Sequence, residues 1–367
     1  MTKKHLGKHG ERPDMNSDFW NGKRVFITGH TGFKGGWMVL WLKKLGAVVK
    51  GYSLEPNTKP SLFEVANIAK NIESEIGDIR DLEILKNSVL SFAPEIIIHM
   101  AAQPLVRQSY QDPVGTYQSN IMGTVNILES VRHCKSVKAF VNVTTDKCYE
   151  NKEWVWGYRE NESMGGHDPY SSSKGCSELI TSAYRESFFK GKTDVSLASA
   201  RAGNVIGGGD WANDRLIPDA LRAFDSGNSV NIRNPLAVRP WQHVLEPVSG
   251  YLMLAEKLYY SLDEYAEGWN FGPDDRDAKP VGEVLEYLVA HWPSIVTWSI
   301  DKSSQPHEAQ LLKLDITKAR ALLKWEPRWN LNYALQSIIK WHFAWLNGED
   351  MEIVTLDQID NFEKHAI

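Results

Sequence analysis

The stretch Lys23–Gly35, with the sequence KRVFITGHTGFKG, decides the fold of this chain. Lys23–Thr28 is a short apolar run that ends in glycine, as a buried parallel strand does. Three glycines then follow in the spacing GxxGxxG, and Trp37–Leu45 has helical periodicity. At such a helix N-terminus a pyrophosphate can approach backbone N–H groups, because no Cβ obstructs it. A plain strand-to-helix turn also uses glycine, but the strand before and the helix after favour a dinucleotide site.

Strands and helices continue to alternate along the first two hundred residues. We expect further strands at Ala47–Tyr52, before Gly77-Asp78, and at Glu95–Met100, Ala139–Thr144 and Val195–Ala200. We expect helices at Asp81–Phe92, with Asp81 as N-cap, and at Tyr117–Arg132 and Ser171–Phe189. This alternation predicts the α/β class, with a doubly wound parallel sheet, the Rossmann arrangement, covered by helices on both faces.

The pattern changes beyond about Ala202. Segments rich in Gly, Pro, Asn and Trp mix there with helices such as Pro218–Asp225 and Val281–Ala290, which suits a smaller mixed α/β lobe. At 367 residues the chain is long enough for two lobes. We therefore expect a disordered tail at 1–18, a dinucleotide-binding domain at 19–201 with a returning segment at 237–270, a substrate-binding lobe at 202–236 and 271–350, and a C-terminal segment at 351–367.

The composition limits the partners and the environment. Charged residues make up 24% of the chain and its net charge is -5, so there is no electrostatic reason to expect nucleic acid or a membrane surface as partner. No apolar run approaches the length that spans a bilayer, and residues 1–15 are too polar for a secretory signal. Cys134, Cys148 and Cys176 have no CxxC spacing, so we expect neither a disulfide framework nor a metal site, which fits a reducing cytoplasm.

Tyr170 and Lys174, in the segment DPYSSSK, lie four residues apart at the start of a helix and hence on one face. A phenol is a poor base at neutral pH, but a neighbouring ammonium group and a positively charged nicotinamide would favour the phenolate. The lysine can also hold the nicotinamide ribose. The alternative is an exposed helix pair, but the place of the two residues after the fifth strand favours hydride transfer at an alcohol carbon.

The end of the second strand bears on the choice of dinucleotide. An acidic residue about 20 residues after the glycines ordinarily binds the ribose 2′-OH of NAD. Here the strand ends as KGYSLE (Lys50–Glu55), so the acid is displaced or missing, and no arginine cluster replaces it. We therefore expect NAD rather than NADP.

Together these features resemble the extended short-chain dehydrogenase/reductase family. The resemblance rests on the glycine loop, Asp78-Ile79, Ala101-Ala102, Thr144-Thr145 and the Tyr170/Lys174 pair, and it covers the chain from about Phe19 onward. It implies that Asp78 and Ile79 bracket the adenine, that Asn120 supports the site from a helix, and that Thr145 hydrogen-bonds the hydroxyl that Tyr170 deprotonates. The cofactor-binding residues that it implies are Gly29, Thr31, Gly32, Phe33, Lys34, Gly35, Asp78, Ile79, Ala101, Ala102, Gln103, Asn120, Thr144, Tyr170 and Lys174.

Two ionisable residues, Asp146 and Lys147, follow the fifth strand in the segment Val143–Asn151. A simple epimerase or dehydrogenase needs only the Thr, Tyr and Lys, so a second proton-transfer task is indicated. The segment resembles the strand end of nucleotide-sugar 4,6-dehydratases. The variant TDKCY, together with Ser199–Trp211 and Arg239–Val244, resembles the CDP-glucose 4,6-dehydratases, which implies CDP-glucose as substrate, a cytoplasmic site and a place in deoxysugar (O-antigen) synthesis.

In that family the C4 hydroxyl is oxidised, water is eliminated across C5 and C6, and the hydride returns to C6. Asp146 can be the acid at the C6 hydroxyl if a dry site keeps it protonated. Lys147, in place of the Glu usual in the dTDP-glucose enzymes, would be the base at C5, and burial near a positive charge would favour its neutral form. The alternative for Asp146-Lys147 is an exposed ion pair in a loop.

The second lobe contains the groups that a nucleotide diphosphate needs. By resemblance Asn204 and Arg239 would contact the diphosphate, because a guanidinium fork suits phosphate oxygens. Arg215, Asn270 and His307 are weaker candidates, and loop Arg and Asn residues are often only solvated or capping. Specificity for cytosine rests on resemblance alone.

Other interpretations remain open. One is an epimerase or a GDP-mannose-type dehydratase of the same fold, and another is a dinucleotide-binding sensor without catalysis. Family resemblance also implies a homodimer or homotetramer, paired through the helices at Tyr117–Arg132 and Ser171–Phe189.

Overall fold

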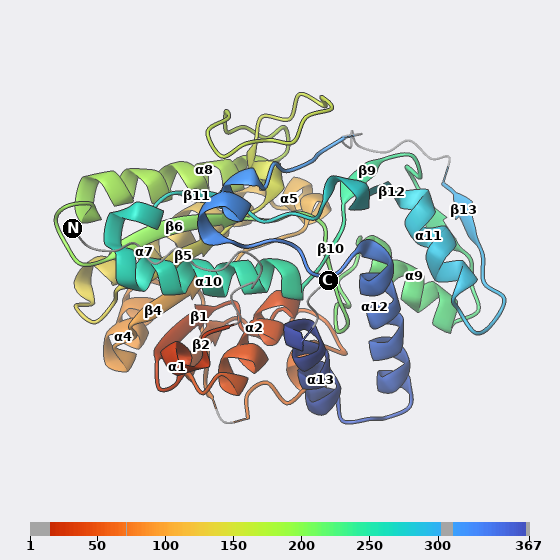
Figure 1. Ribbon diagram of the computed structural model, residues 1–367, viewed down its shortest axis with the longest axis horizontal. Coiled ribbons are helices and arrows are strands. Elements are labelled where there is room, and N and C mark those ends of the chain that lie inside the picture. The colour runs from red at the N-terminus through yellow and green to blue at the C-terminus, as the bar shows by residue number, and fades with distance from the viewer. Residues whose placement is uncertain (1–14, 71, 302–310, 365–367) are drawn as a thin grey trace, which may run out of the picture.

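The strand, turn and helix at Arg24–Lys44 form the centre of the fold. The computed structural model describes residues 15–70, 72–301 and 311–364 (Figure 1). Strand β1, Arg24–Thr28, is almost entirely buried, and helix α2, Phe33–Lys44, begins immediately after Gly32, its N-cap. The predicted strand-turn-helix unit is therefore confirmed.

Within the described residues, one sheet contains seven parallel strands in the order β11-β6-β5-β4-β1-β2-β3. Besides β1 the strands are β2 Val48–Ser53, β3 Glu73–Ile76, β4 Ile96–His99, β5 Ala139–Val143, β6 Ser196–Arg201 and β11 Gly268–Asn270. Thr28 of β1 lies opposite Tyr52 of β2 and His99 of β4. The strand order reverses between β1 and β4, and ligands of doubly wound sheets bind at such a switch point.

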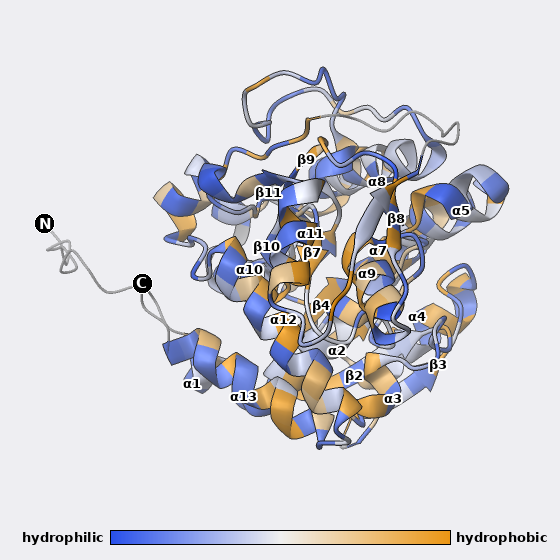
Figure 2. Ribbon diagram, turned by 90° about the vertical axis from the view of Figure 1, so that its right-hand side faces the viewer, coloured by the Kyte–Doolittle hydropathy of each residue, from blue (hydrophilic) through white to orange (hydrophobic). Residues whose placement is uncertain are grey.

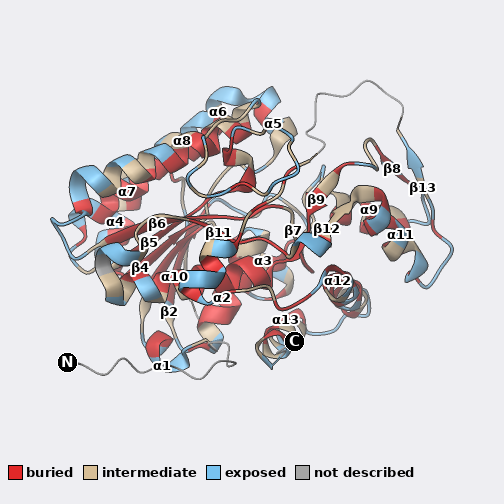
Figure 3. Ribbon diagram, turned by 45° about the horizontal axis from the view of Figure 1, so that its top comes forward, coloured by how far each residue is buried: buried red, intermediate tan, exposed pale blue. Residues whose placement is uncertain are grey.

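Alternate residues of the strands enter two different cores, as the period of a strand requires. Val25 and Ile27 of β1 pack on one face with Ile96 and Ile98 of β4, whereas Phe26 faces the other side. Helices α2 and α10 (Leu245–Ser261) lie on the first face, while α4 (Leu82–Phe92), α7 (Gly123–His133) and α8 (Pro169–Tyr184) cover the second. Figure 3 shows the strands as a buried layer between these helices, which confirms the predicted Rossmann arrangement.

The two long helices of the second face are each continued by a π-helical turn. One unit consists of α6 (Pro113–Tyr117), the π turn Gln118–Met122 and α7, and the other of α8 and the π turn Arg185–Phe189. The carboxylate of Asp168 caps α8 by accepting from Ser171 N at 2.9 Å. Pro169 occupies the first turn, where no N–H is needed. The cap fixes where Tyr170 and Lys174 lie.

A second, smaller core lies beside the sheet, at the right of Figure 1. It is formed by α9 (Leu216–Asp225), α11 (Val281–Ala290) and α12 (Leu331–Leu346), with β8 (Val230–Ile232) parallel to β13 (Trp298–Ile300). Two short ladders, β7 (Val205–Ile206) with β10 (Gln242–His243) and β9 (Val238–Pro240) with β12 (Ala278–Pro280), lie outside the central sheet. The remaining helices are α1 Ser17–Trp20, α3 Leu62–Val65, α5 Val106–Gln111 and α13 Met351–Lys364.

The C-terminal helix α13 packs against α2 and α12, and Trp41 Nε1 donates to Glu363 at 2.8 Å. Figure 2 shows apolar residues gathered in the central strands, while α12 and α13 carry both polar and apolar segments. The sequence analysis did not identify β11, α10, α12 or α13. The tail expected at 1–18 is also corrected, because α1 begins at Ser17 and buries Phe19 and Trp20; residues 1–14 lie outside the described residues.

Candidate active site

The glycine loop after β1 has the geometry that a dinucleotide needs. Gly29 has a φ of +83°, and a Cβ there would lie 2.8 Å from Ala101 N. A Cβ on Gly35 would lie 2.1 Å from Gly29 O, so neither position admits a side chain. Gly32, in contrast, is exposed at the N-terminus of α2, where a Cβ would meet nothing closer than 3.4 Å. The loop is closed on its inner side and open at the helix N-terminus, so these residues fit a pyrophosphate.

Hydrogen bonds join the glycine loop region to the ends of the neighbouring strands. Met100 N and Ala101 N both donate to Thr28 Oγ1 at 3.1 Å, which ties the end of β4 to the end of β1. Thr31 Oγ1 lies 2.8 Å from Ser53 Oγ and donates to Leu54 O at 2.8 Å, so the end of β2 is held as well. The loop, Ala101 and Ala102 therefore line the same switch point.

Asp78 and Ile79 follow β3, as expected. The Arg80 guanidinium hydrogen-bonds the Asp78 carboxylate and lowers the pKa of that carboxyl. Ile79 is buried, and a Cβ on Gly123 would lie 2.8 Å from its Cγ2.

Asn120 lies in the π turn before α7 and is almost fully buried. Its Oδ1 accepts from Gln103 N at 2.8 Å, and its Nδ2 donates to Gln103 O at 3.0 Å and to Ser173 Oγ at 2.8 Å. All of its amide groups are thus engaged with the protein. Asn120 thus joins Gln103 to Ser173 of α8, and its predicted role in cofactor binding stays a prediction.

The residues after β5 form a short 3₁₀ turn, Asp146–Cys148, capped by Thr145. Thr145 Oγ1 donates to Asp146 Oδ1 at 3.0 Å, and Asp146 is only 2% exposed. Burial raises the pKa of the Asp146 carboxyl, and Lys147, Thr145 and Arg239 oppose this effect without reversing it. Asp146 is therefore a buried acid and does not form an exposed ion pair. Lys147 is half-buried beside it.

Tyr170 and Lys174 are both buried on the first turns of α8. Lys174 Nζ donates to Val143 O at 3.3 Å, so the pair faces the end of β5 and is not an exposed helix pair. Burial raises the pKa of Tyr170 to about 12, and a hydrogen bond with Thr145 only partly offsets this rise. Burial likewise lowers the pKa of Lys174 to about 8. The effect expected of Lys174 together with a positively charged nicotinamide stays a prediction, because in the protein alone burial has the largest effect on the pKa of Tyr170.

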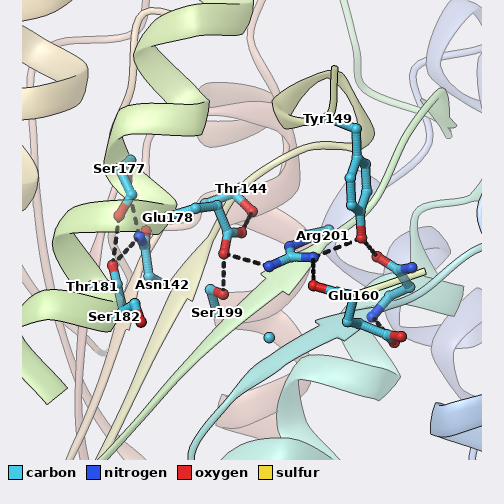
Figure 4. A network of polar contacts seen from close by, with 12 residues as sticks. Asn142, Thr144, Tyr149, Glu160, Ser177, Glu178, Thr181, Ser182, Ser199 and Arg201 are labelled. Carbon is cyan, nitrogen blue, oxygen red and sulfur yellow. Dashed lines mark hydrogen bonds and ion pairs between the residues drawn. The ribbon is translucent and has the colours of Figure 1, made fainter. Parts of the chain in front are cut away.

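A buried polar network holds the catalytic strand end from behind (Figure 4). Glu178, one helical turn after Lys174, accepts from Thr144 Oγ1, from Ser199 Oγ and from Arg201 Nη2, the last at 2.9 Å. Arg201 Nη1 also donates to Tyr149 OH at 2.6 Å, which fixes the far end of the 145–148 turn. The hydroxyl of Thr144 is therefore turned toward Glu178, and a role of Thr144 in cofactor binding stays a prediction.

Two further groups belong to this arrangement: the ammonium of Lys34, which is a predicted cofactor-binding residue, and the phenol of Tyr251 on α10, which was not predicted. Their Nζ and OH atoms lie 3.5 Å apart. Burial, followed by the cations Arg215 and Lys174, lowers the pKa of Lys34 to about 7, while Asp146 opposes this shift. The resemblance implied only that Lys34 belonged to the cofactor loop. No sequence signal singled out Tyr251, which a long helix brings back from a distant segment.

The predicted substrate-binding residues have different surroundings in the structure. Arg239, on β9, is buried and acts electrostatically on Asp146. Arg215 pairs with Asp210 at 2.8 Å and acts on both Lys34 and Tyr170. Asn204 has a φ of +43°, and its buried Nδ2 has no hydrogen-bond partner in the described part of the chain. Arg239 and Arg215 therefore act on the predicted catalytic residues Asp146 and Tyr170.

Asn270 is not part of this arrangement. It is fully buried, accepts from Tyr149 OH at 2.7 Å and donates to Tyr158 O at 2.8 Å and Asp315 O at 3.1 Å. Its side chain is a link between segments, so the prediction that it binds substrate is corrected. His307 lies outside the described residues.

In the chain as described, no group of three or more His, Cys, Asp or Glu side chains is arranged to hold a metal ion. None of the helices formed by the described residues is both long and apolar enough to cross a membrane.

Comparisons with known proteins show which family the chain resembles. The profile of the family described as GDP-mannose 4,6 dehydratase matches residues 26–338. A CDP-glucose 4,6-dehydratase from Salmonella typhimurium is 56% identical over 352 residues, which cover 95% of this chain and 98% of the relative. A dTDP-glucose 4,6-dehydratase from Haemophilus influenzae is 22% identical, over 87% of this chain and 97% of that protein.

Solved structures share the fold at low sequence identity. A UDP-glucose 4-epimerase from Thermotoga maritima, solved with UDP-glucose, aligns with a TM-score of 0.75 at 23% identity, over 88% of this chain and 99% of its own. A dTDP-glucose 4,6-dehydratase from Bacillus anthracis in complex with NAD aligns with a TM-score of 0.72 at 20% identity, over 90% and 100% of the two chains. The chain thus shares the arrangement of its sheet and flanking helices with these structures.

Proposed function

The chain belongs to the GDP-mannose 4,6-dehydratase family, and from that membership we propose that it dehydrates CDP-glucose with NAD as cofactor. It converts CDP-D-glucose into CDP-4-keto-6-deoxy-D-glucose by oxidation at C4, elimination of water across C5 and C6, and return of the hydride to C6. The observation that carries this conclusion is Asp146, a buried carboxyl with a raised pKa beside Lys147. Epimerisation at C4 has no use for an acid and a base at C5 and C6, so this pair favours dehydration.

Oxidation at C4 is assigned to Tyr170, Thr145 and Lys174. Tyr170 takes the proton of the C4 hydroxyl, and Thr145, already hydrogen-bonded to Tyr170, holds the same oxygen. NAD, when bound in the loop Gly29–Gly35, supplies the acceptor for the C4 hydride, the donor for C6 and the positive charge of the oxidised nicotinamide. Lys174 holds the nicotinamide ribose. Because the pKa of Tyr170 is about 12 in the protein alone, the phenol keeps its proton until the complete site is assembled.

Elimination is assigned to Asp146 and Lys147. The 4-ketone acidifies the C5 proton, Lys147 removes that proton as a neutral amine, and Asp146 donates a proton to the departing C6 hydroxyl. Burial makes Asp146 suited to this task, because a carboxyl with a raised pKa still has a proton to give.

The nucleotide diphosphate is assigned to Arg239, Asn204 and, less directly, Arg215. The support is the electrostatic effect of the two arginines on the predicted catalytic residues, together with the unpartnered, buried Nδ2 of Asn204. An amide donor that is buried without a protein partner is suited to a phosphate oxygen. His307 is retained as a further substrate-binding candidate.

The assembly proposed is a homodimer or a homotetramer, in the cytoplasm, whose product enters deoxysugar (O-antigen) synthesis. The support for pairing is that the π-continued helices expose the large apolar side chains Met122, Leu179 and Phe188. Sedimentation equilibrium of the protein and of a Met122→Asp/Leu179→Asp variant tests it, because a monomeric wild-type protein would exclude the pairing.

Turnover with a panel of substrates tests the function. The protein is incubated with NAD and CDP-, dTDP-, UDP- or GDP-linked glucose or mannose, and the product is examined for a 4-keto-6-deoxy sugar and its alkali-induced absorbance. We expect product with CDP-glucose. Product only with another nucleotide sugar would exclude CDP, a C4 epimer would indicate an epimerase, and tight NAD binding without any turnover would indicate a sensor.

A further inference from the structure

The carboxyl of Asp146 lies directly against the backbone of Gly203, two residues after the end of β6. A Cβ built on Gly203 would lie 1.8 Å from Asp146 Oδ2, 2.2 Å from its Cγ and 2.7 Å from its Oδ1. Non-bonded carbon atoms pack at about 3.5–4 Å. No side chain fits at position 203 while the carboxyl stays where it is.

The requirement for glycine comes from this contact and not from the backbone conformation. Gly203 is not among the described glycines with a positive φ, whereas the neighbouring Asn204 is itself in the left-handed region. An alanine could adopt the backbone of Gly203 without strain. The three heavy atoms nearest to a Cβ there are all carboxyl atoms of Asp146.

The backbone at Gly203 is held from its other side. Gln242 is buried on β10, and its Nε2 donates to Gly203 O at 3.1 Å and to Phe271 O at 2.9 Å. Its own N–H donates to Asn204 O at 3.3 Å. A methyl group at position 203 would therefore displace the carboxyl of Asp146 more readily than it would displace the main chain.

The two carboxyl oxygens of Asp146 also differ in their hydrogen bonds. Oδ1 accepts from Thr145 Oγ1, while Oδ2, which is buried, has no hydrogen-bond partner among the residues that the structure describes. A charged oxygen without a donor is costly in such a place, whereas a protonated one is not. Oδ2 is thus the oxygen that suits the proton of the acid.

We propose that Gly203 is a positioning residue for the elimination step, and that its missing side chain lets Asp146 lie dry against β6 with Oδ2 ready to protonate the C6 hydroxyl. This inference rests on the acid role proposed for Asp146. It assigns to Gly203 a task that acts after oxidation at C4, because the three atoms nearest to a Cβ at this position belong to Asp146 and not to Tyr170 or Lys174.

The first test is Gly203→Ala, assayed with CDP-glucose and NAD. We expect kcat for dehydration to fall on the order of 10²-fold, the cost of a misplaced catalytic group. Exchange of the C5 hydrogen with solvent deuterium should continue, because oxidation and the action of Lys147 precede loss of the hydroxyl. The displaced acid should be better hydrated, so the alkaline limb of the kcat profile should move to lower pH. Gly282→Ala on α11, where a Cβ would meet nothing closer than 3.3 Å, is the control and should keep the wild-type rate and profile.

A second variant separates the contact from a general need for glycine. Removing the carboxyl makes room for a methyl group, so Asp146→Ala/Gly203→Ala should regain the Tm that Gly203→Ala loses, and should dehydrate no more slowly than Asp146→Ala alone. Wild-type kcat and pH profile in Gly203→Ala would overturn the proposal, as would a double variant that folds no better than the single one. If Asp146→Asn dehydrates normally, the acid role itself fails, which is a distinguishable result.

Discussion

Consecutive threonines at the end of β5 each donate to a buried carboxyl group, Thr144 to Glu178 and Thr145 to Asp146. The two carboxyls are about equally buried, yet their pKa values shift in opposite directions. For both groups burial alone would raise the pKa. For Glu178 the guanidinium of Arg201 and the hydroxyls of Ser199 and Thr144 more than offset this effect, and the pKa falls.

Asp146 receives less support. One of its oxygens accepts from Thr145, and the other has no partner in the described part of the chain. The charge of Arg201 and the number of hydrogen-bond donors, and not burial alone, thus decide the direction in which each pKa shifts. The protein satisfies the group that fixes the strand end and leaves unsatisfied the group that must give up a proton.

Tyr170→Phe should produce the largest effect, because it removes the base that acts before either carboxyl matters. We expect the rate of dehydration to fall on the order of 10³–10⁴-fold, the upper range for a general base. No C5 exchange should be seen, because without the 4-ketone the C5 proton is not acidic. Steady-state assays and deuterium incorporation measure both effects, and a variant with near-normal turnover would remove Tyr170 from the mechanism.

Glu178→Gln removes the charge of the carboxyl whose oxygens both accept hydrogen bonds. It leaves the guanidinium of Arg201 buried without a counter-charge, so the free energy of unfolding should fall by about 3–5 kcal/mol. The matched control is Glu283→Gln, which breaks the exposed pair with Lys279 and should cost about 0.3–0.5 kcal/mol. Urea denaturation of the two variants measures the difference. Equal losses would mean that the network does not hold the strand end.

Much of the Rossmann half could be predicted from the sequence. Most of its strands are short apolar runs followed by a turn residue, so each can be recognised from its own local sequence. β11 was missed because three residues, Gly268–Asn270, carry no period, and only their pairing with β6 makes them a strand. In the second lobe only the helices α9 and α11 could be predicted from the sequence. The helices α10, α12 and α13 have buried and exposed faces that depend on partners far away in the chain.

The candidate site divides in the same way. Thr145, Asp146, Lys147, Tyr170 and Lys174 were predicted because strand ends and helix spacing bring them together locally. The sequence did not reveal whether an amide faces substrate or protein, so Asn120 and Asn270 were assigned to ligands although the chain itself uses their hydrogen bonds. Gly203 could not be singled out either. Its contact with Asp146 joins the ends of two strands that are far apart in the sequence.

Lys147→Ala tests whether the half-buried lysine beside Asp146 works as the base. We expect the rate of dehydration to fall about 10²-fold, as for the loss of one general base, while oxidation at C4 persists and C5 exchange disappears. Lys152→Ala, in the same loop but exposed, is the control and should be neutral. Normal dehydration by Lys147→Ala would show that another group removes the C5 proton.

The smallest effect is on stability, and here the two carboxyls should respond to pH with opposite signs. Because the folded-state pKa of Asp146 is raised, the folded state binds more protons than the unfolded state above the ordinary value of 3.8, and Asp146 costs stability as the pH rises. Asp146→Asn should therefore raise the free energy of unfolding at pH 7, on the order of 1 kcal/mol for each pKa unit. The gain should vanish as the pH falls toward 3.8.

Glu178 should show the reverse, since its folded-state pKa lies below the ordinary 4.5. Its contribution is fully present above that pH and is lost as the pH falls through the folded-state value, so the deficit of Glu178→Gln should shrink on acidification. Denaturation of both variants between pH 3 and pH 8 measures the two slopes. Slopes of the same sign would mean that burial dominates at both carboxyls, and that the donors from Ser199, Thr144 and Arg201 do not set the charge of Glu178.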